Sequence, residues 1–220
     1  MSSKRRPNKK TPKNKTNKQW VNRHINDPFV KKAQGQGYRS RAVYKLDEIQ
    51  KQDKLFKGNL LVADLGSAPG GWSQYIMRNF PNVEVIALDL LEMEPVQGVE
   101  FIQGDFTEPE TIEKVMKLTQ GRKFDLVISD IAPNITGVRD VDNARYEVVL
   151  DAILYFCELN LKTDGRLLVK LFEGGAAQRY RAQTKKVFQK NAVRKPVASR
   201  PGSKELYFLS TTIKAKLFHL

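Results

Sequence analysis

Short apolar runs alternate with amphipathic segments along most of the 220-residue chain. Seven runs have the length and the aliphatic content that strands show, and they cover residues 60–65, 83–88, 99–103, 124–129, 166–172, 192–198 and 205–213. Helical spacing of apolar positions predicts helices over 40–53, from about 71 to 79, from about 108 onward, over 143–161 and over 175–190. This alternation predicts an α/β fold, a doubly wound and mostly parallel seven-stranded sheet with helices on both faces.

The N-terminal end has a different composition. Residues 1–18 are rich in Lys, Arg, Asn, Thr and Pro and contain no aliphatic side chain after Met1, so we expect a flexible basic tail. Between Trp20 and Leu46 the pattern predicts a short helical lead-in that is interrupted at Gly35-Gln36-Gly37. We expect residues 19–220 to form a single domain.

Charge is distributed unevenly around the net value of +14. Residues 1–40 and 162–220 each carry a net charge of +11, whereas residues 41–161 carry −8. Basic surfaces of this size attract polyanions, and nucleic acid is the commonest polyanion inside a cell. The alternative is a solvated basic face that only aids solubility.

Cysteine and histidine are scarce. With Cys157 as the single cysteine, the chain cannot form an internal disulfide, and the distance in sequence between His24 and His219 argues against a metal site. No apolar run approaches the roughly 20 residues of a membrane-spanning helix, and the N-terminus lacks the apolar stretch of a signal peptide. We therefore expect a cytoplasmic protein, with no metal and no membrane partner. No self-complementary apolar segment stands out, so we expect a monomer.

Ligands of doubly wound sheets bind at the carboxyl ends of the strands. Asp64 lies near the end of the first predicted strand and a glycine-rich turn, GSAPGGW at 66–72, follows that strand, while Asp89, Asp105 and Asp130 follow three later strands. Its glycine spacing does not match the dinucleotide-binding fingerprint, which disfavours a nicotinamide oxidoreductase. Several carboxylates suit a cofactor with a ribose and a cationic end, and S-adenosylmethionine is such a molecule. The alternative is that these acids only terminate strands.

The kind of atom that would accept a transferred methyl group follows from excluding nitrogen and carbon acceptors. Residues 129–134 lack the Asn/Asp-Pro-Pro-aromatic segment that amino-group methyltransferases usually place after the fourth strand. Cys157 falls on the apolar stripe of a predicted helix, where a structural role is expected rather than that of a nucleophile. An oxygen acceptor remains. Lys170 lies inside an apolar strand, where lysines are rare without a reason, so we expect it to be functional.

Several ordered motifs resemble those of the FtsJ-like ribose 2′-O-methyltransferases, and within them the bacterial enzymes that modify large-subunit (23S) ribosomal RNA. The resembling segments are SRAVYKLDEI at 40–49, DLGSAPGGWSQ at 64–74, QGDF at 103–106, SDIAPN at 129–134, VK at 169–170, SR at 199–200 and SKE at 203–205. The resemblance runs from about Trp20 to the end of the last strand and implies a Rossmann-like S-adenosylmethionine-dependent methyltransferase fold.

The resemblance also implies roles for individual residues. The family's catalytic Lys-Asp-Lys-Glu tetrad falls on Lys45, Asp130, Lys170 and Glu205, with Lys170 expected at the 2′-oxygen. The S-adenosylmethionine contacts carried over by motif are Gly70, Trp72, Asp89, Asp105 and Asp130. The implied substrate is a uridine ribose in 23S rRNA, met in the assembled large ribosomal subunit. Candidate RNA-facing positions are 178–190, 194–200, Arg39 and Arg41.

Two alternatives remain open at this point. A sister enzyme that methylates a ribose of tRNA or of an mRNA cap would carry the same tetrad. A non-catalytic RNA-binding factor in ribosome assembly could have kept the fold, although such a protein has no need of Lys170 within a strand.

Overall fold

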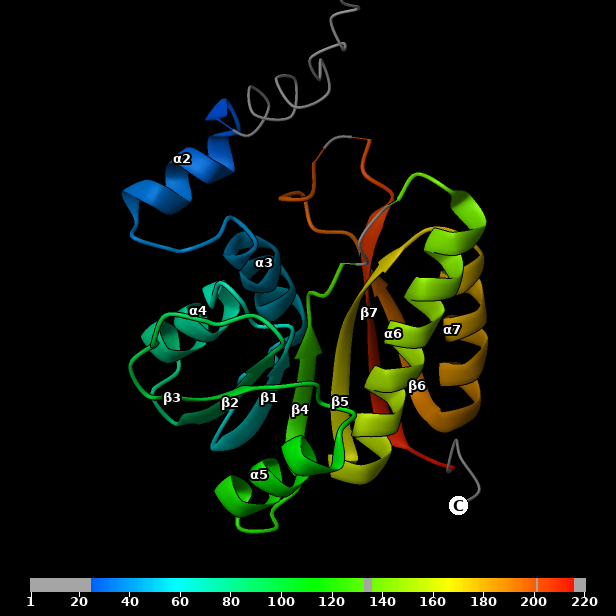
Figure 1. Ribbon diagram of the computed structural model, residues 1–220. Helices are drawn as coiled ribbons and strands as arrows, with labels where there is room; N and C mark the ends of the chain where they lie inside the picture. The colour runs from blue at the N-terminus through cyan, green and yellow to red at the C-terminus, as the bar shows by residue number, and fades with distance from the viewer. Residues whose placement is uncertain (1–24, 133–135, 201, 216–220) are drawn as a thin grey trace, which may run out of the picture.

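The computed structural model describes residues 25–132, 136–200 and 202–215, and these form one central sheet (Figure 1). Its seven strands lie in the order β3-β2-β1-β4-β5-β7-β6. They span Leu60–Leu65 (β1), Val83–Asp89 (β2), Val99–Gln103 (β3), Phe124–Ser129 (β4), Leu161–Phe172 (β5), Phe188–Arg194 (β6) and Glu205–Ile213 (β7). All neighbouring pairs are parallel except those of β7, which is antiparallel to β5 and to β6. The expected α/β fold class is confirmed.

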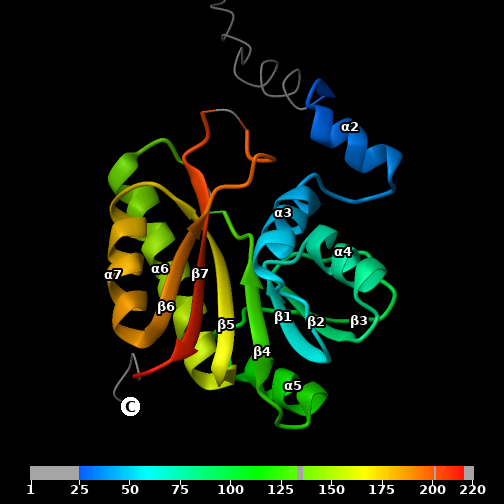
Figure 2. The same ribbon diagram turned by 180° about the vertical axis from the view of Figure 1, so that it is seen from behind.

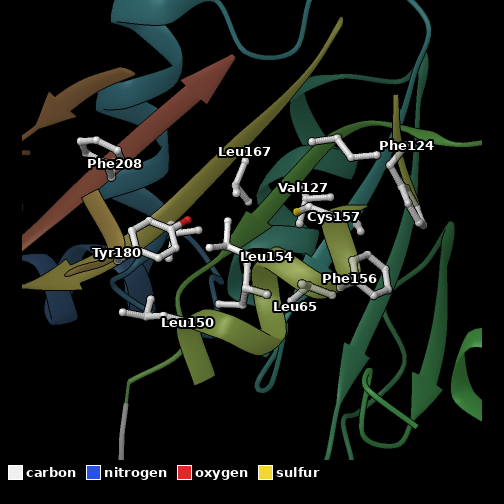
Figure 3. Close-up of a cluster of buried hydrophobic side chains, with 14 of the residues drawn as sticks. Leu65, Phe124, Val127, Leu150, Leu154, Phe156, Cys157, Leu167, Tyr180 and Phe208 are labelled. Atoms are coloured by element: carbon white, nitrogen blue, oxygen red, sulfur yellow. The ribbon is translucent and has the colours of Figure 1, made fainter. Parts of the chain in front are cut away.

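Helices cover both faces of the sheet (Figures 1 and 2). The described helices are α2 (Pro28–Gly35), α3 (Val43–Asp53), α4 (Gly71–Asn79), α5 (Pro109–Thr119), α6 (Arg139–Asn160) and α7 (Gly175–Val187). Buried side chains of α2, α3 and α4 form the core on one face, and those of α5, α6 and α7 form the core on the other. Figure 3 shows part of the second core, where Leu154 of α6 lies near Leu167 of β5 and Tyr180 of α7.

Most predicted strands have their predicted bounds, but the sixth does not. Helix α7 ends at Val187, and β6 begins at the buried Phe188 rather than at 192. The apolar residues that suggested the later strand, Val193 and Val197, are 48% and 83% exposed. Pairing with β7 sets the position of β6, because Phe188 faces Ile213 and Arg194 faces Tyr207.

Two other elements, β5 and α6, begin earlier in the sequence than predicted. Strand β5 begins at Leu161 rather than 166, because Leu161 pairs with Phe124 across an irregularity in the ladder. Residues 162–165 are Lys, Thr, Asp and Gly, so the hydrophobic pattern does not predict this part of the strand. Helix α6 begins at Arg139 rather than 143. The predicted tail at 1–18 lies outside the described residues, so the division into tail and domain stays a prediction.

The topology brings the predicted site residues to one edge of the sheet. Strands β1, β2, β3, β4 and β5 are parallel, so their carboxyl ends, with Asp89, Asp130 and Lys170, point the same way. Strand β7 runs in the opposite direction and starts at this edge with Glu205. Within the described residues, no helix is both long and apolar enough to span a membrane, and no cluster of three His, Cys, Asp or Glu could hold a metal ion.

Candidate active site

The turn between β1 and α4 approaches the loop after β4 closely. Gly66 has φ +72°, and a Cβ there would lie 2.1 Å from Cγ1 of Ile131. The amides of Gly66 and Ser67 both donate to the carbonyl of Leu88, at 2.8 and 3.2 Å. Only glycine combines this backbone conformation with this approach. The turn is therefore held against two neighbouring strand ends.

A cavity of about 390 Å³ lies beside this turn. Asp89 accepts from the amides of Ala68 and Leu91, both at 2.8 Å, and so ties the turn to the end of β2. Asp105 accepts through Oδ1 from the amide and hydroxyl of Thr107. The cavity combines these carboxylates with apolar walls, and its lining includes Gly66, Ala68, Asp89, Leu90, Leu91, Asp105, Phe106, Asp130, Ile131 and Val148. It suits a flat apolar ring joined to a sugar.

A second, smaller cavity of about 60 Å³ adjoins the first and shares Gly66, Ala68 and Asp130 with it. Asp64 lines it, is 1% exposed and accepts from the hydroxyl of Ser73 at 2.6 Å. Burial, reinforced by the negative charge of Asp130, raises the pKa of Asp64 to about 7. Ser67 Oγ is buried there, and no partner for it lies among the described residues. A ligand group with a positive charge and hydrogen-bonding atoms would satisfy both side chains.

Of the other two predicted cofactor contacts, Trp72 lines the small cavity and Gly70 lines neither cavity. Trp72 donates from Nε1 to the carbonyl of Ala42 at 2.9 Å and packs on the ring of Tyr207. Gly70 caps α4 and is absent from the described lining of both cavities. A Cβ there would lie 2.9 Å from Sδ of Met93 and 3.0 Å from the guanidinium of Arg39. Direct contact of Gly70 with a cofactor stays a prediction.

Four residues distant in sequence form two buried ion pairs next to these cavities. Lys170 Nζ lies 3.1 Å from Oδ1 of Asp130 and also donates to the carbonyl oxygen of Asp130. Lys45 Nζ lies 2.8 Å from both carboxylate oxygens of Glu205. All four predicted tetrad residues therefore meet at one edge of the sheet, and a third cavity of about 420 Å³ opens beside Lys45 and Glu205.

Tyr207 joins the two ion pairs and is not among the residues that the motifs predict for the site. It faces Lys170 across the β5–β7 ladder, and its hydroxyl donates to Asp130 Oδ1 at 2.6 Å. Its ring centroid lies 6.0 Å from Lys45 Nζ. Burial and the charge of Asp130 raise the pKa of Tyr207 well above its usual value, so it stays a donor. Its position two residues after Glu205, on the same face of a strand, was the available signal.

Several arginines predicted to face RNA have partners inside the protein. Arg39 donates to the carbonyls of Pro69, Glu94 and Pro95, and Arg194 forms a two-pronged pair with Asp53. Arg41 and Arg200 both contact Asp27. These contacts give the guanidinium groups partners within the protein, and Arg41 and Arg200 also line the third cavity, so their part in binding RNA stays a prediction. In α7, Lys185 and Lys186 are exposed, whereas Arg179 and Arg181 pair with acids.

Comparisons with known proteins agree with this arrangement. The sequence profile described as FtsJ-like methyltransferase matches residues 38–212. The chain is 46% identical to the ribosomal RNA large subunit methyltransferase E of Janthinobacterium sp. (strain Marseille), over 93% of this chain and 99% of that one. It is 45% identical to the protein of the same name from Burkholderia multivorans, over 92% and 98% of the two chains.

Solved structures show the same fold. A ribosomal RNA methyltransferase of Plasmodium falciparum superposes with a TM-score of 0.72 at 28% identity, covering 80% of this chain and 98% of that one. Human methyltransferase-like protein 13, solved in complex with SAH, superposes with a TM-score of 0.55 at 15% identity. It covers 77% of this chain and 79% of the human chain, and it supports the fold alone.

Proposed function

Because the chain belongs to the FtsJ-like methyltransferase family, we propose that it methylates the 2′-hydroxyl of a uridine ribose in 23S rRNA, with S-adenosylmethionine as methyl donor. One observation at the site supports this proposal independently of the sequence comparisons. The Lys170–Asp130 ion pair lies where the 390 Å³ cavity and the small cavity meet, because Asp130 lines both of them.

The chain's residues fit this cofactor. The 390 Å³ cavity offers Asp89 and Asp105 for ribose and adenine polar atoms between apolar walls. The small cavity offers the Asp64 carboxylate and the orphaned Ser67 hydroxyl for the cationic amino-acid end. When bound, the cofactor supplies an electrophilic methyl group on a sulfonium.

The tetrad supplies the acceptor side of the reaction. A ribose hydroxyl is a weak nucleophile at neutral pH, so the protein must orient its lone pair and receive its proton. We infer that Lys170 Nζ holds the 2′-oxygen and that Asp130, which pairs with Lys170 and accepts from Tyr207, receives the proton. Lys45 and Glu205 flank the third cavity, where the acceptor nucleotide enters. Positioning of this kind contributes several kcal/mol to lowering a barrier.

The proposal also includes the assembly in which the RNA is methylated, the oligomeric state of the protein and its compartment. The large ribosomal subunit is the substrate in which 23S rRNA presents the target ribose, and the protein acts on it as a monomer in the bacterial cytoplasm. Support for large-subunit ribosomal RNA as the substrate comes from the names of the relatives that are 45–46% identical over nearly the whole chain.

Methyl transfer from labelled S-adenosylmethionine to purified large subunits that lack the modification tests the proposal. We expect label in a 2′-O-methyl nucleoside with the wild-type protein and none with Lys170→Ala. Lys162→Ala is the matched control, because Lys162 lies on the same strand at its other end and pairs with Asp125. Label on tRNA but not on large subunits would show that tRNA, not 23S rRNA, is the substrate. Cofactor binding without methyl transfer to any RNA would contradict the proposal that the protein is an enzyme.

A further inference from the structure

The connection from β6 to β7 leads directly into Glu205, and one face of α3 holds it. We call its described residues, 195–200 and 202–204, the β6–β7 loop. Lys45 and Glu48 lie on one side of α3, and Arg41 stands in the turn just before the helix, four residues ahead of Lys45. Arg41 donates to the carbonyl of Ala198 in this loop, and Lys45 pairs with Glu205. The helix that carries one member of the tetrad therefore also holds the loop that leads to another.

Glu48 makes the most specific of these contacts. Its Oε2 accepts from the amide of Val197 at 2.6 Å, and its Oε1 accepts from the amide of Ala198 at 2.9 Å. Hydrogen bonds from two consecutive amides to one charged carboxylate are strong and set the orientation of that backbone. The Val197 side chain is 83% exposed, so its own packing contributes little to holding the loop here.

Ser199 connects this held backbone to the tetrad. Its hydroxyl donates to Oε1 of Glu205 at 3.0 Å, and its amide donates to the carbonyl of Pro196. Ser199 is 8% exposed. The oxygen that it contacts is one of the two that face Lys45 Nζ. The hydroxyl therefore limits rotation of the Glu205 carboxylate about its side chain.

We propose that Glu48 and Ser199 are positioning residues for methyl transfer. Glu48 holds the β6–β7 loop so that the Ser199 hydroxyl keeps the Glu205 carboxylate aligned with Lys45. The assignment rests on the proposed function, because it gives these residues a part in that reaction. Neither residue is among those that line the three cavities described above, so both act through Glu205.

The test uses the full-length protein, labelled S-adenosylmethionine and large subunits lacking the modification. Ser199→Ala removes the donor to Glu205, and we expect kcat to fall about 10- to 100-fold, the range that small misplacements of reacting groups cause. Cofactor Kd should stay unchanged. Ser199→Thr keeps a hydroxyl and should restore most of kcat, which a role in packing alone would not predict.

Glu48→Gln removes one of the two carboxylate acceptors and should lower kcat by a similar factor. Because both residues act along one path, the double variant should be no slower than the slower single variant. Asp53→Asn is the matched control. Asp53 joins α3 to Arg194 at the end of β6, at 2.5 and 2.7 Å, without contacting residues 197–205 in the described contacts. It should lower the Tm and leave kcat unchanged.

Unchanged kcat in Ser199→Ala would overturn the proposal, and so would multiplicative losses in the double variant. A crystal structure of the Ser199→Ala variant distinguishes a failure of the positioning role from a failure of the proposed function, because it shows the Glu205 carboxylate directly. Glu205 turned away from Lys45 in that structure supports the positioning geometry even if the wild-type protein transfers no methyl group to RNA. Glu205 in its original place, together with wild-type kcat, contradicts the positioning role alone.

Discussion

The cofactor side and the acceptor side of this site are assembled in different ways. On the cofactor side, Asp105 contacts Thr107 two residues away, Asp64 contacts Ser73, and Asp89 contacts Ala68. On the acceptor side, Lys45 and Glu205 are 160 residues apart in sequence. Contacts between residues at most 21 positions apart thus position the carboxylates of the cofactor side, whereas the Lys45–Glu205 pair forms only when β7 lies beside β5.

The two sides also differ in how charge is balanced. Each lysine of the tetrad has a carboxylate within hydrogen-bonding distance. The acids Asp64, Asp89 and Asp105 instead accept from amides and hydroxyls, and the described ion pairs include no cation for them. A site with uncompensated carboxylates favours a cationic ligand, whereas a balanced pair can orient a neutral hydroxyl. Substitutions on the two sides should therefore separate cofactor affinity from turnover.

The largest effect is expected on the acceptor side. Lys170→Met keeps the length of the side chain and removes its charge, so kcat should fall about 10²- to 10⁴-fold. Lys170 is not among the described lining residues of either cofactor cavity, so cofactor Kd should stay within about twofold. Single-turnover kinetics and calorimetry measure the two quantities. A variant that kept more than a tenth of wild-type kcat would contradict the assignment.

On the cofactor side, Gly66→Ala should have the next largest effect. The new Cβ would meet Ile131 at 2.1 Å in a left-handed conformation, so the turn must move and cofactor affinity should fall about 10-fold or more. Gly58→Ala is the control, because Gly58 has φ +89° and nothing within 4 Å of a Cβ. It should cost about 1–2 kcal/mol of stability and leave cofactor affinity alone. Equal cofactor affinities in the two variants would contradict the role given to the turn.

Arg39 offers an intermediate test of the cofactor side. It links the Pro69 turn to the carbonyls of Glu94 and Pro95, in the loop that follows Leu90 and Leu91. Arg39→Ala should weaken cofactor binding about 3- to 10-fold, as expected for lost hydrogen bonds, without changing kcat at saturation. Arg78→Ala is the control, since Arg78 donates to the neighbouring Gln36 and Gly37 carbonyls instead. A change in kcat would show that the two sides are coupled.

The smallest effect concerns the pH dependence of stability. The folded protein keeps a proton on Asp64 up to about pH 7, whereas the unfolded chain loses it near pH 4. The folded state therefore loses stability as pH rises from about 4 to about 7, and the loss is complete above that range. Asp64→Asn removes this dependence, so its Tm should rise relative to wild type between pH 5 and pH 8. A constant difference in Tm over this range would mean that the Asp64 carboxyl titrates at its ordinary pKa.

Much of the fold was predictable because its signals are local. Five strands have their predicted bounds to within a residue, since each is a short apolar run between turns. The predicted bounds of β6 are wrong because Val193 and Val197 are apolar yet exposed, and because the buried Phe188, which the pattern places in the preceding helix, starts the strand. Hydrophobicity reports burial in general, but the ladder with β7 decided which residues pair.

The sequence by itself determined the order of the elements, the acids at the strand ends and a lysine within an apolar strand, because these depend on neighbours along the chain. Only the tertiary structure decided that Tyr207 joins the two ion pairs. It also decided that Arg39, Arg41 and Arg194 contact acceptors within the protein. A long charged side chain takes whichever partner the fold brings near, and the acceptors named above for these arginines lie 14 to 157 residues away.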